Sequence, residues 1–405
     1  MNLKHIRKIL RDTDYVHTGG SAEELKAAEY LKAECEAMGA KAWLEAFPVQ
    51  MADVHTATLT VDGIGIPCKG YKNCGSGEVE ADFLYLPSQD EVSLKSVKGK
   101  IVLIDGGLRH FGYQDLLDNG AVGFITYDGN INFPNRDIDA KELRDFVAEG
   151  RKALAVNINA KDAQRLVKSH AKTAKIAIEQ TEYEGESRNV VAELPGTSDE
   201  WIILTAHYDT VPLSHGAYDN MSGCIGLLEV MDELRAAPHR YGLRFLFCGS
   251  EERGLLGSKA YTDAHDEELK NAVLNINLDM IGSVMGRFIA RVSAEDRLVS
   301  FIQYFAQSRG FAVDAATGVY SSDSTPFADH GVPALSFARL TPAGQGNIHC
   351  RYDTAELLSP EQLRADGRFV SEFTRFMADA AFCPVKREIP EKIKDDLDKY
   401  LNRKR

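Results

Sequence analysis

The sequence predicts an α/β fold in which a mostly parallel mixed sheet is flanked by helices and carries an inserted β-rich accessory domain. Three observations support this prediction. From about residue 186 onward, continuous apolar runs typical of buried strands alternate with helical patterns. Residues 50–185 instead hold short strand-like runs separated by turn residues. The 405 residues also exceed one typical core, so two domains are expected.

These patterns divide the chain at about residues 50 and 185. We expect residues 1–49 and 186–405 to form the main domain and residues 50–185 to form the insertion. We interpret the insertion as a lid or accessory domain, because it contains no cluster of acids and histidines that resembles a metal site.

Local periodicity predicts the individual elements. A helix is expected over residues 21–38, where Ser21 and Glu24 form a capping-box pattern and Gly39 follows the last apolar position. A second helix is expected at 222–236, and an amphipathic helix at 388–402. The expected strands of the main domain are 42–49, 201–205, 243–247, 272–278 and 332–337. Those of the insertion are 56–61, 83–86, 101–104, 123–127 and 153–158.

Composition excludes several classes of protein. A net charge of −13 argues against a nucleic-acid partner. No apolar run reaches the roughly 18 residues that a membrane span needs. The seven cysteines are scattered and form no C-x-x-C pair, which favours free thiols in a reducing compartment. Because the first residues do not resemble a secretory signal, we expect a cytoplasmic location. The alternative is a secreted protein whose signal has been removed.

Acids and histidines recur in short motifs at or after predicted strands. His207 and Asp209, in AHYDT, point the same way along an extended chain. A carboxylate in the position of Asp209 can fix the tautomer of a zinc-binding histidine. Glu251 and Glu252, in GSEERG, are adjacent and therefore diverge. One of them can bind a metal while the other addresses a water molecule.

Three further motifs extend this set. Asp219, in GAYDNMSG, precedes a predicted helix and could equally cap it. Asp279, in NINLDMIG, follows an apolar strand, where a carboxylate is costly unless it is paired or metal-bound. His349, in NIHCRYDT, lies in a polar loop. Taken alone, each of these residues also has an ordinary structural explanation.

Together the motifs indicate a binding site, because they follow predicted strands and open α/β sheets bind ligands at the carboxyl ends of their strands. Two histidines and three carboxylates suit zinc, with cobalt or manganese as substitutes. We expect a metal site built from His207, Asp219, Glu252, Asp279 and His349.

The order of these motifs resembles that of metallopeptidase family 28, the co-catalytic zinc aminopeptidases. The similar motifs are H-x-D, D-N-x-S-G, E-E-x-G-L-x-G-S, L-D-M-I-G and I-H-x-x-x-D-T, and the resemblance covers residues 1–49 and about 186–385. It implies the zinc exopeptidase fold and two zinc ions. The insertion resembles a protease-associated domain, which many relatives carry at this point.

The resemblance also implies a division of the ligands. Asp219 would bridge both metals. His207 and Asp279 would share one metal, and Glu252 and His349 would share the other.

It further implies roles for residues that do not bind metal. Glu251 matches the general base, and Asp209 matches the partner of the zinc-binding histidine. Some members of the family use a tyrosine to stabilise the oxyanion. Tyr320, just before a segment that matches S-D-x-x-P-F, is our hypothesis for that role, although its register differs.

We therefore expect a zinc-dependent exopeptidase, an aminopeptidase that acts on peptides with a free N-terminus. The alternative on the same scaffold is a carboxypeptidase or dipeptidase, which would need a basic residue such as Arg339 or Arg351 to receive a C-terminal carboxylate. Glutaminyl cyclase chemistry, with one zinc, and a catalytically inactive receptor-like relative are the remaining alternatives. We expect no nucleic-acid or membrane partner.

Overall fold

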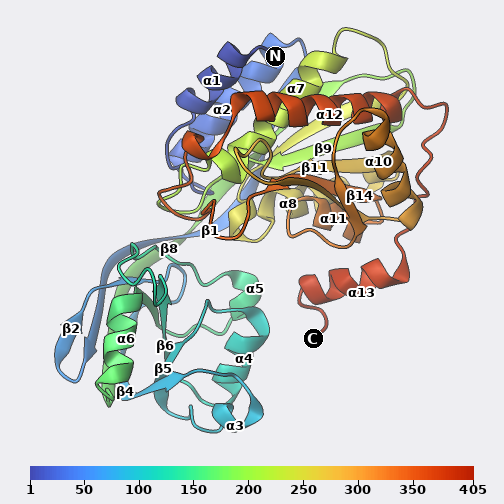
Figure 1. Ribbon diagram of the computed structural model, residues 1–405. Helices are drawn as coiled ribbons and strands as arrows, with labels where there is room; N and C mark the ends of the chain where they lie inside the picture. Colours follow the sequence, from blue (N-terminus) through green and yellow to red (C-terminus); the bar gives the residue numbers. More distant parts are fainter. The chain divides into compact units, whose positions relative to one another are not determined.

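The computed structural model describes residues 1–405, which divide into two compact units (Figure 1). Unit 1 comprises Met1–Val49 and Glu186–Lys404, and unit 2 comprises Gln50–Gly185. Two long strands, β1 (Lys41–Val61) and β8 (Thr173–Leu194), pair with each other and run from one unit into the other. The predicted strands 42–49 and 56–61 are therefore parts of one continuous strand. That unit 2 is a protease-associated domain stays a prediction.

Unit 1 is built on a sheet with the strand order β13-β12-β14-β11-β9-β10-β8. Its central strand β9 runs parallel to both β10 and β11, and β11 runs parallel to β14. The carboxyl ends of these four strands therefore meet at one edge of the sheet. Strands β12 and β8 are antiparallel to their neighbours β14 and β10. The bounds are β9 (Trp201–His207), β10 (Gly242–Cys248), β11 (Ala272–Leu278), β12 (Arg287–Ser293), β13 (Asp314–Thr317) and β14 (Ala334–Leu340).

Helices cover both faces of this sheet. Ile202 and Leu204 of β9 belong to a core shared with α1, α2, α7, α10 and α12, whereas Ile203 belongs to a core shared with α8, α9 and α11. This alternation follows from the two-residue period of a strand. It explains why β9 reads as an uninterrupted apolar run. The helices are α1 (Leu3–Asp12), α2 (Ala22–Ala37), α7 (Ser222–Leu234), α8 (Leu256–Ala264), α9 (Asp266–Leu269), α10 (Asp296–Ser308), α11 (Ser324–Asp329) and α12 (Pro360–Ala378).

The C-terminal amphipathic helix is present as α13 (Glu391–Tyr400). Its buried residues Ile393 and Leu397 pack with Ile389 against Ala328 and Ala334. No helix of the protein combines the length and the apolar character that a membrane span requires. All seven cysteines are free.

Unit 2 has its own sheet and its own apolar core. Strands β4, β5, β6 and β7 are parallel neighbours, with β8 and β3 antiparallel at the two sides. Its strands are β2 (Ile64–Ile66), β3 (Cys68–Gly70), β4 (Gly77–Leu86), β5 (Lys100–Ile104), β6 (Gly123–Asp128) and β7 (Ala155–Asn159). Its helices are α3 (Glu91–Leu94), α4 (His110–Asp118), α5 (Asp145–Ala148) and α6 (Ala160–Lys168). The unit thus contains more helix than its sequence pattern indicates.

Candidate metal centre

The predicted ligands gather at the carboxyl edge of the unit 1 sheet. His207 is the last residue of β9, and Asp279 directly follows β11. Asp219 lies in η1 (Ala217–Met221), the irregular turn that precedes α7, and Glu252 lies in the short 3-10 turn η2 (Glu251–Arg253) after β10. His349 lies in the loop after β14. Because His207 and Asp219 both follow from β9, four strand ends supply the five side chains.

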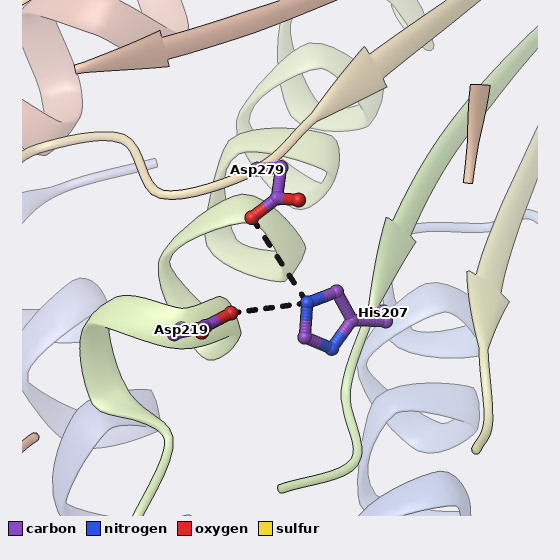
Figure 2. A group of neighbouring side chains, drawn as sticks. All are labelled: His207, Asp219 and Asp279. Atoms are coloured by element: carbon purple, nitrogen blue, oxygen red, sulfur yellow. Dashed lines mark ion pairs between the residues drawn. The ribbon is translucent and has the colours of Figure 1, made fainter. Parts of the chain in front are cut away.

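A first group consists of His207, Asp219 and Asp279, all buried (Figure 2). The Nε2 atom of His207 lies 3.1 Å from Oδ1 of Asp219 and 4.0 Å from Oδ1 of Asp279. Figure 2 shows the imidazole directed between the two carboxylates. This arrangement presents one nitrogen and two oxygen donors to a common point.

A second group consists of Asp219, Glu252 and His349. The Nε2 atom of His349 lies 3.1 Å from Oδ2 of Asp219 and 3.0 Å from Oε1 of Glu252. Asp219 therefore turns one oxygen to each group. Within each group the donor atoms all lie within 4.8 Å of one another. One carboxylate therefore joins two groups of donors, each of which could hold a metal ion.

Burial and neighbouring charges shift the pKa values of the donor side chains. Burial and the neighbouring Asp219 raise the pKa of Asp279 to about 7. Burial opposes a charge on His349, but its hydrogen bonds with Asp219 and Glu252 raise the pKa of the imidazole to about 11. Burial likewise acts against a charge on Asp219, yet the two histidines hold the pKa of that carboxyl below its usual range. The histidines and carboxylates thus interact strongly within one buried cluster.

The residues fit a metal pair. The Oδ1 atom of Asp279 is buried and accepts no hydrogen bond. A buried carboxylate oxygen without a donor or a cation is costly, so this atom calls for a positive partner. Imidazole nitrogens and carboxylate oxygens are ligands that zinc accepts. Each group offers three of these, which leaves room in the coordination sphere for water or substrate.

Asp209 holds the turn that carries the two glutamates. Its Oδ1 accepts the backbone N–H of Glu251 at 2.8 Å, and its Oδ2 accepts that of Glu252 at 3.3 Å. The Nδ1 atom of His207 lies 3.7 Å from Oδ1 of Asp209 and 3.3 Å from its backbone oxygen. Asp209 therefore lies beside the second nitrogen of His207, as the motif predicts, and also fixes η2, which the motif does not indicate.

Glu251 faces the first group. Its Oε2 lies 3.9 Å from Nε2 of His207, and its side chain is 12% exposed. Burial raises the pKa of Glu251 well above its usual value; His207 opposes this rise, whereas Glu252 and Asp279 add to it. The carboxylate therefore has a high affinity for a proton.

Tyr320 lies in the electrostatic field of the same centre. Burial, followed by the charges of Asp279 and Asp219, raises the pKa of its phenol well above the usual value. The hydroxyl is thus a proton donor rather than a phenolate. Its role as an oxyanion donor stays a prediction.

The sequence reasoning missed two buried acids. Asp353 accepts the backbone N–H groups of Tyr218 at 2.8 Å and of Asp219 at 3.2 Å. Asp323 is fully buried, and burial raises its pKa to about 6. Both lie inside motifs that were recognised, NIHCRYDT and YSSDSTPF. An unassigned acid within a ligand motif is the signal that could have found them.

Fold and donors together define an α/β protein with a candidate two-metal site at the carboxyl edge of its sheet. Residues 189–374, which hold all five donors, match the model of peptidase family M28. The matched residues, a little under half of the chain, are similar to that family.

Curated relatives share this region. Aminopeptidase YwaD of Bacillus subtilis (strain 168) is 32% identical over 206 residues, which are 48% of this chain and 44% of the relative. Leucine aminopeptidase 2 of Arthroderma otae is 32% identical over 209 residues, 47% of this chain and 38% of the relative. The chain thus spans less than half the length of these two relatives.

Solved structures share the whole fold. A zinc aminopeptidase from Bacillus subtilis superposes with a TM-score of 0.79 and 23% identity, over 97% of this chain and 98% of that one. An aminopeptidase from Aneurinibacillus sp. strain AM-1 gives a TM-score of 0.77 and 23% identity, over 95% and 96%. At this identity the likeness establishes the fold, including the presence of an inserted unit.

Proposed function

We propose that this protein is a zinc-dependent aminopeptidase that hydrolyses N-terminal residues from peptides and holds two zinc ions. The observation that carries the proposal is Asp219, which offers one oxygen to each of two donor groups, with Glu251 alongside. The match of residues 189–374 to peptidase family M28 and the names of the aligned relatives support it.

In this mechanism His207, Asp219 and Asp279 would hold one ion, and Asp219, Glu252 and His349 the other. The ions supply a Lewis acid that polarises the scissile carbonyl and lowers the pKa of water. Glu251 acts as the general base, taking a proton from the attacking water and passing it to the leaving amine. Its raised pKa suits the first transfer, since a carboxylate with high proton affinity accepts the proton of the attacking water readily.

The hydrogen bonds and ion pair of Arg339 argue against its use as the carboxylate-binding residue of a carboxypeptidase. Its guanidinium makes a two-point ion pair with Asp366, with N···O distances of 2.6 and 2.8 Å, and donates a third hydrogen bond to the backbone oxygen of Gly286. Recruiting Arg339 to a C-terminal carboxylate would leave Asp366, which is fully buried, without its cation. These contacts exclude Arg339 but not Arg351, the other basic residue considered, and the names of the aligned relatives favour the aminopeptidase.

The test combines metal analysis with a substrate panel. Purified protein should contain about two zinc ions per chain and should release p-nitroaniline from aminoacyl-p-nitroanilides. N-acetylated versions of the same substrates are the control and should remain intact. Cleavage of N-blocked peptides from their C-terminal end would reject the aminopeptidase. Fewer than about two bound ions in the active protein would reject the two-metal mechanism.

A further inference from the structure

A buried acid on the second helix reaches the turn that carries Glu251 and Glu252. Glu24 of α2 is fully buried. Its Oε1 accepts the backbone N–H of Ser250 at 3.1 Å and the hydroxyl of Ser187 at 2.7 Å. Its Oε2 accepts the backbone N–H of Gly20 at 2.7 Å. One carboxylate thus joins α2, β8 and the end of the loop after β10.

Three consecutive backbone N–H groups of this turn therefore donate hydrogen bonds to buried carboxylates. Ser250 donates to Glu24, and Glu251 and Glu252 donate to Asp209. Ser250 has a φ of 53°, in the left-handed region, which is unfavourable for a non-glycine residue. The acceptors compensate this cost and hold the turn in a conformation that it would not otherwise prefer.

Two glycines allow the acid to come this close. A Cβ atom on Gly249 would lie 2.8 Å from Oε1 of Glu24 and 2.7 Å from Oγ of Ser187. A Cβ atom on Gly19, just before α2, would lie 2.3 Å from Oγ of Ser250. All three distances are shorter than a Cβ atom tolerates, so the contact between the start of α2 and the turn depends on glycine at both positions.

Capping of α2 does not account for Glu24. The N-terminus of this helix is already capped by Ser21, whose side chain accepts the N–H of Glu24 at 3.0 Å. The Glu24 carboxylate instead accepts three of its four hydrogen bonds from residues outside the helix and its N-terminal flank: one from the hydroxyl of Ser187, and two from the N–H and hydroxyl of Ser250. Its contacts point to a function at the turn.

We propose that Glu24 is a positioning residue that fixes the turn Ser250–Glu252 and thereby aligns the base Glu251 and the ligand Glu252. The proposal rests on the proposed function. It is selective between the two donor groups, because Glu252 belongs to the group with His349 and not to the group with His207. Loss of Glu24 should therefore loosen one ion and leave the other.

The test compares two substitutions at Glu24 with a matched control on the same helix. Glu24→Ala removes every acceptor, so kcat should fall about 10- to 100-fold, as is typical when the support of a metal ligand is lost. KM should stay within about twofold, because groups that bind substrate are untouched. Glu24→Gln keeps an oxygen that can accept from Ser250 and Ser187, so it should restore most of kcat.

Two further variants separate positioning from general stability. Glu34→Gln alters a partly buried glutamate of α2 that pairs with His5 at 2.7 Å, remote from the turn, and should behave as wild type. Ser187→Ala removes one contact of Glu24 but leaves its bond to Ser250, and should also keep kcat. Thermal unfolding of each variant shows that it is folded.

Metal binding gives a readout that does not depend on activity. Titration of the zinc-loaded protein with a chelator should release one ion from Glu24→Ala at a lower chelator concentration than from wild type. The second ion should be released at the same chelator concentration as from wild type. Equal loosening of both ions, or a lowered melting temperature with unchanged kcat and zinc affinity, would overturn the inference. If wild type hydrolyses no aminoacyl substrate, the proposed function fails, and the zinc titration alone decides the role of Glu24.

Discussion

Replacement of Asp353 tests whether the shared ligand depends on its support. The Asp353 carboxylate accepts two backbone N–H groups, from Tyr218 and Asp219, and is fully buried. Asp353→Ala would leave both donors buried without a partner. At about 1–3 kcal/mol for each unpaired group, the free energy of unfolding of unit 1 should fall by about 2–6 kcal/mol. That is a large part of the roughly 5–15 kcal/mol typical of a folded domain.

The expected effect on zinc affinity follows from the position of Asp219 between the two donor groups. Because Asp219 contributes to each group, Asp353→Ala should weaken the binding of both zinc ions together, in contrast to Glu24→Ala. Urea unfolding of the metal-free protein, followed by circular dichroism, measures the first effect. Chelator titration measures the second.

Asp366→Ala is the matched control. Asp366 is an equally buried aspartate of unit 1 that accepts a backbone N–H, from Gly282, but contacts no predicted ligand. Its loss should destabilise the protein and leave zinc affinity unchanged. Wild-type affinity for both ions in Asp353→Ala, or a destabilisation below about 1 kcal/mol, would refute the reasoning.

Three other predictions address catalysis and pH. Glu251→Gln should keep both ions but lower kcat by about 10²- to 10⁴-fold, measured with an aminoacyl-p-nitroanilide; substantial residual turnover would remove Glu251 as the base. Tyr320→Phe should lower kcat by about 10²- to 10³-fold with unchanged zinc content, and normal turnover would exclude an oxyanion role. Burial, followed by the charge of Asp209, raises the pKa of Glu24 from 4.5 to about 8, so the folded state retains a proton that the unfolded state releases. The stability that this proton contributes is complete below pH 4.5 and is lost as the pH rises to about 8. Other buried acids, such as Asp279 and Asp323, titrate in the same range, so urea unfolding of the metal-free protein should show a smaller decline in Glu24→Gln than in wild type.

Strands β9, β10, β11 and β14 of the unit 1 sheet were predictable, because burial on both faces produces a continuous apolar run in the sequence. Strands β8, β12 and β13 were not among the expected strands. The run at 201–205 anticipates β9, and acids or histidines that directly follow such runs identify the sheet edge. Strand β13 was missed, because its four residues Asp314–Thr317 carry no apolar run and depend on pairing with β12. Short strands of this kind are defined by their neighbours rather than by their own residues.

The hydrogen bonds that hold the predicted metal ligands in place were less predictable from the sequence than the ligands themselves. The capping-box pattern at Ser21 and Glu24 correctly places the start of α2, but the Glu24 side chain binds Gly20 and Ser250 instead of closing the box on Ser21. Ser250 is 226 residues away, and Asp353 is 134 residues from Asp219. Spacing along the chain carries no information about contacts at such separations, because they exist only after the sheet has brought the loops together.

The two long strands give unit 2 the character of an exchangeable module. The chain leaves unit 1 along β1 and returns along β8, and these strands pair. The two crossings are neighbours, since a Cβ atom on Gly185 would lie 2.6 Å from Cγ of Met51. Because the two ends of the insertion are adjacent, its size does not affect the distance between the residues of unit 1 to which it is joined. Evolution could therefore gain, enlarge or replace this unit while the sheet edge that bears His207 and Asp279 stayed as it was.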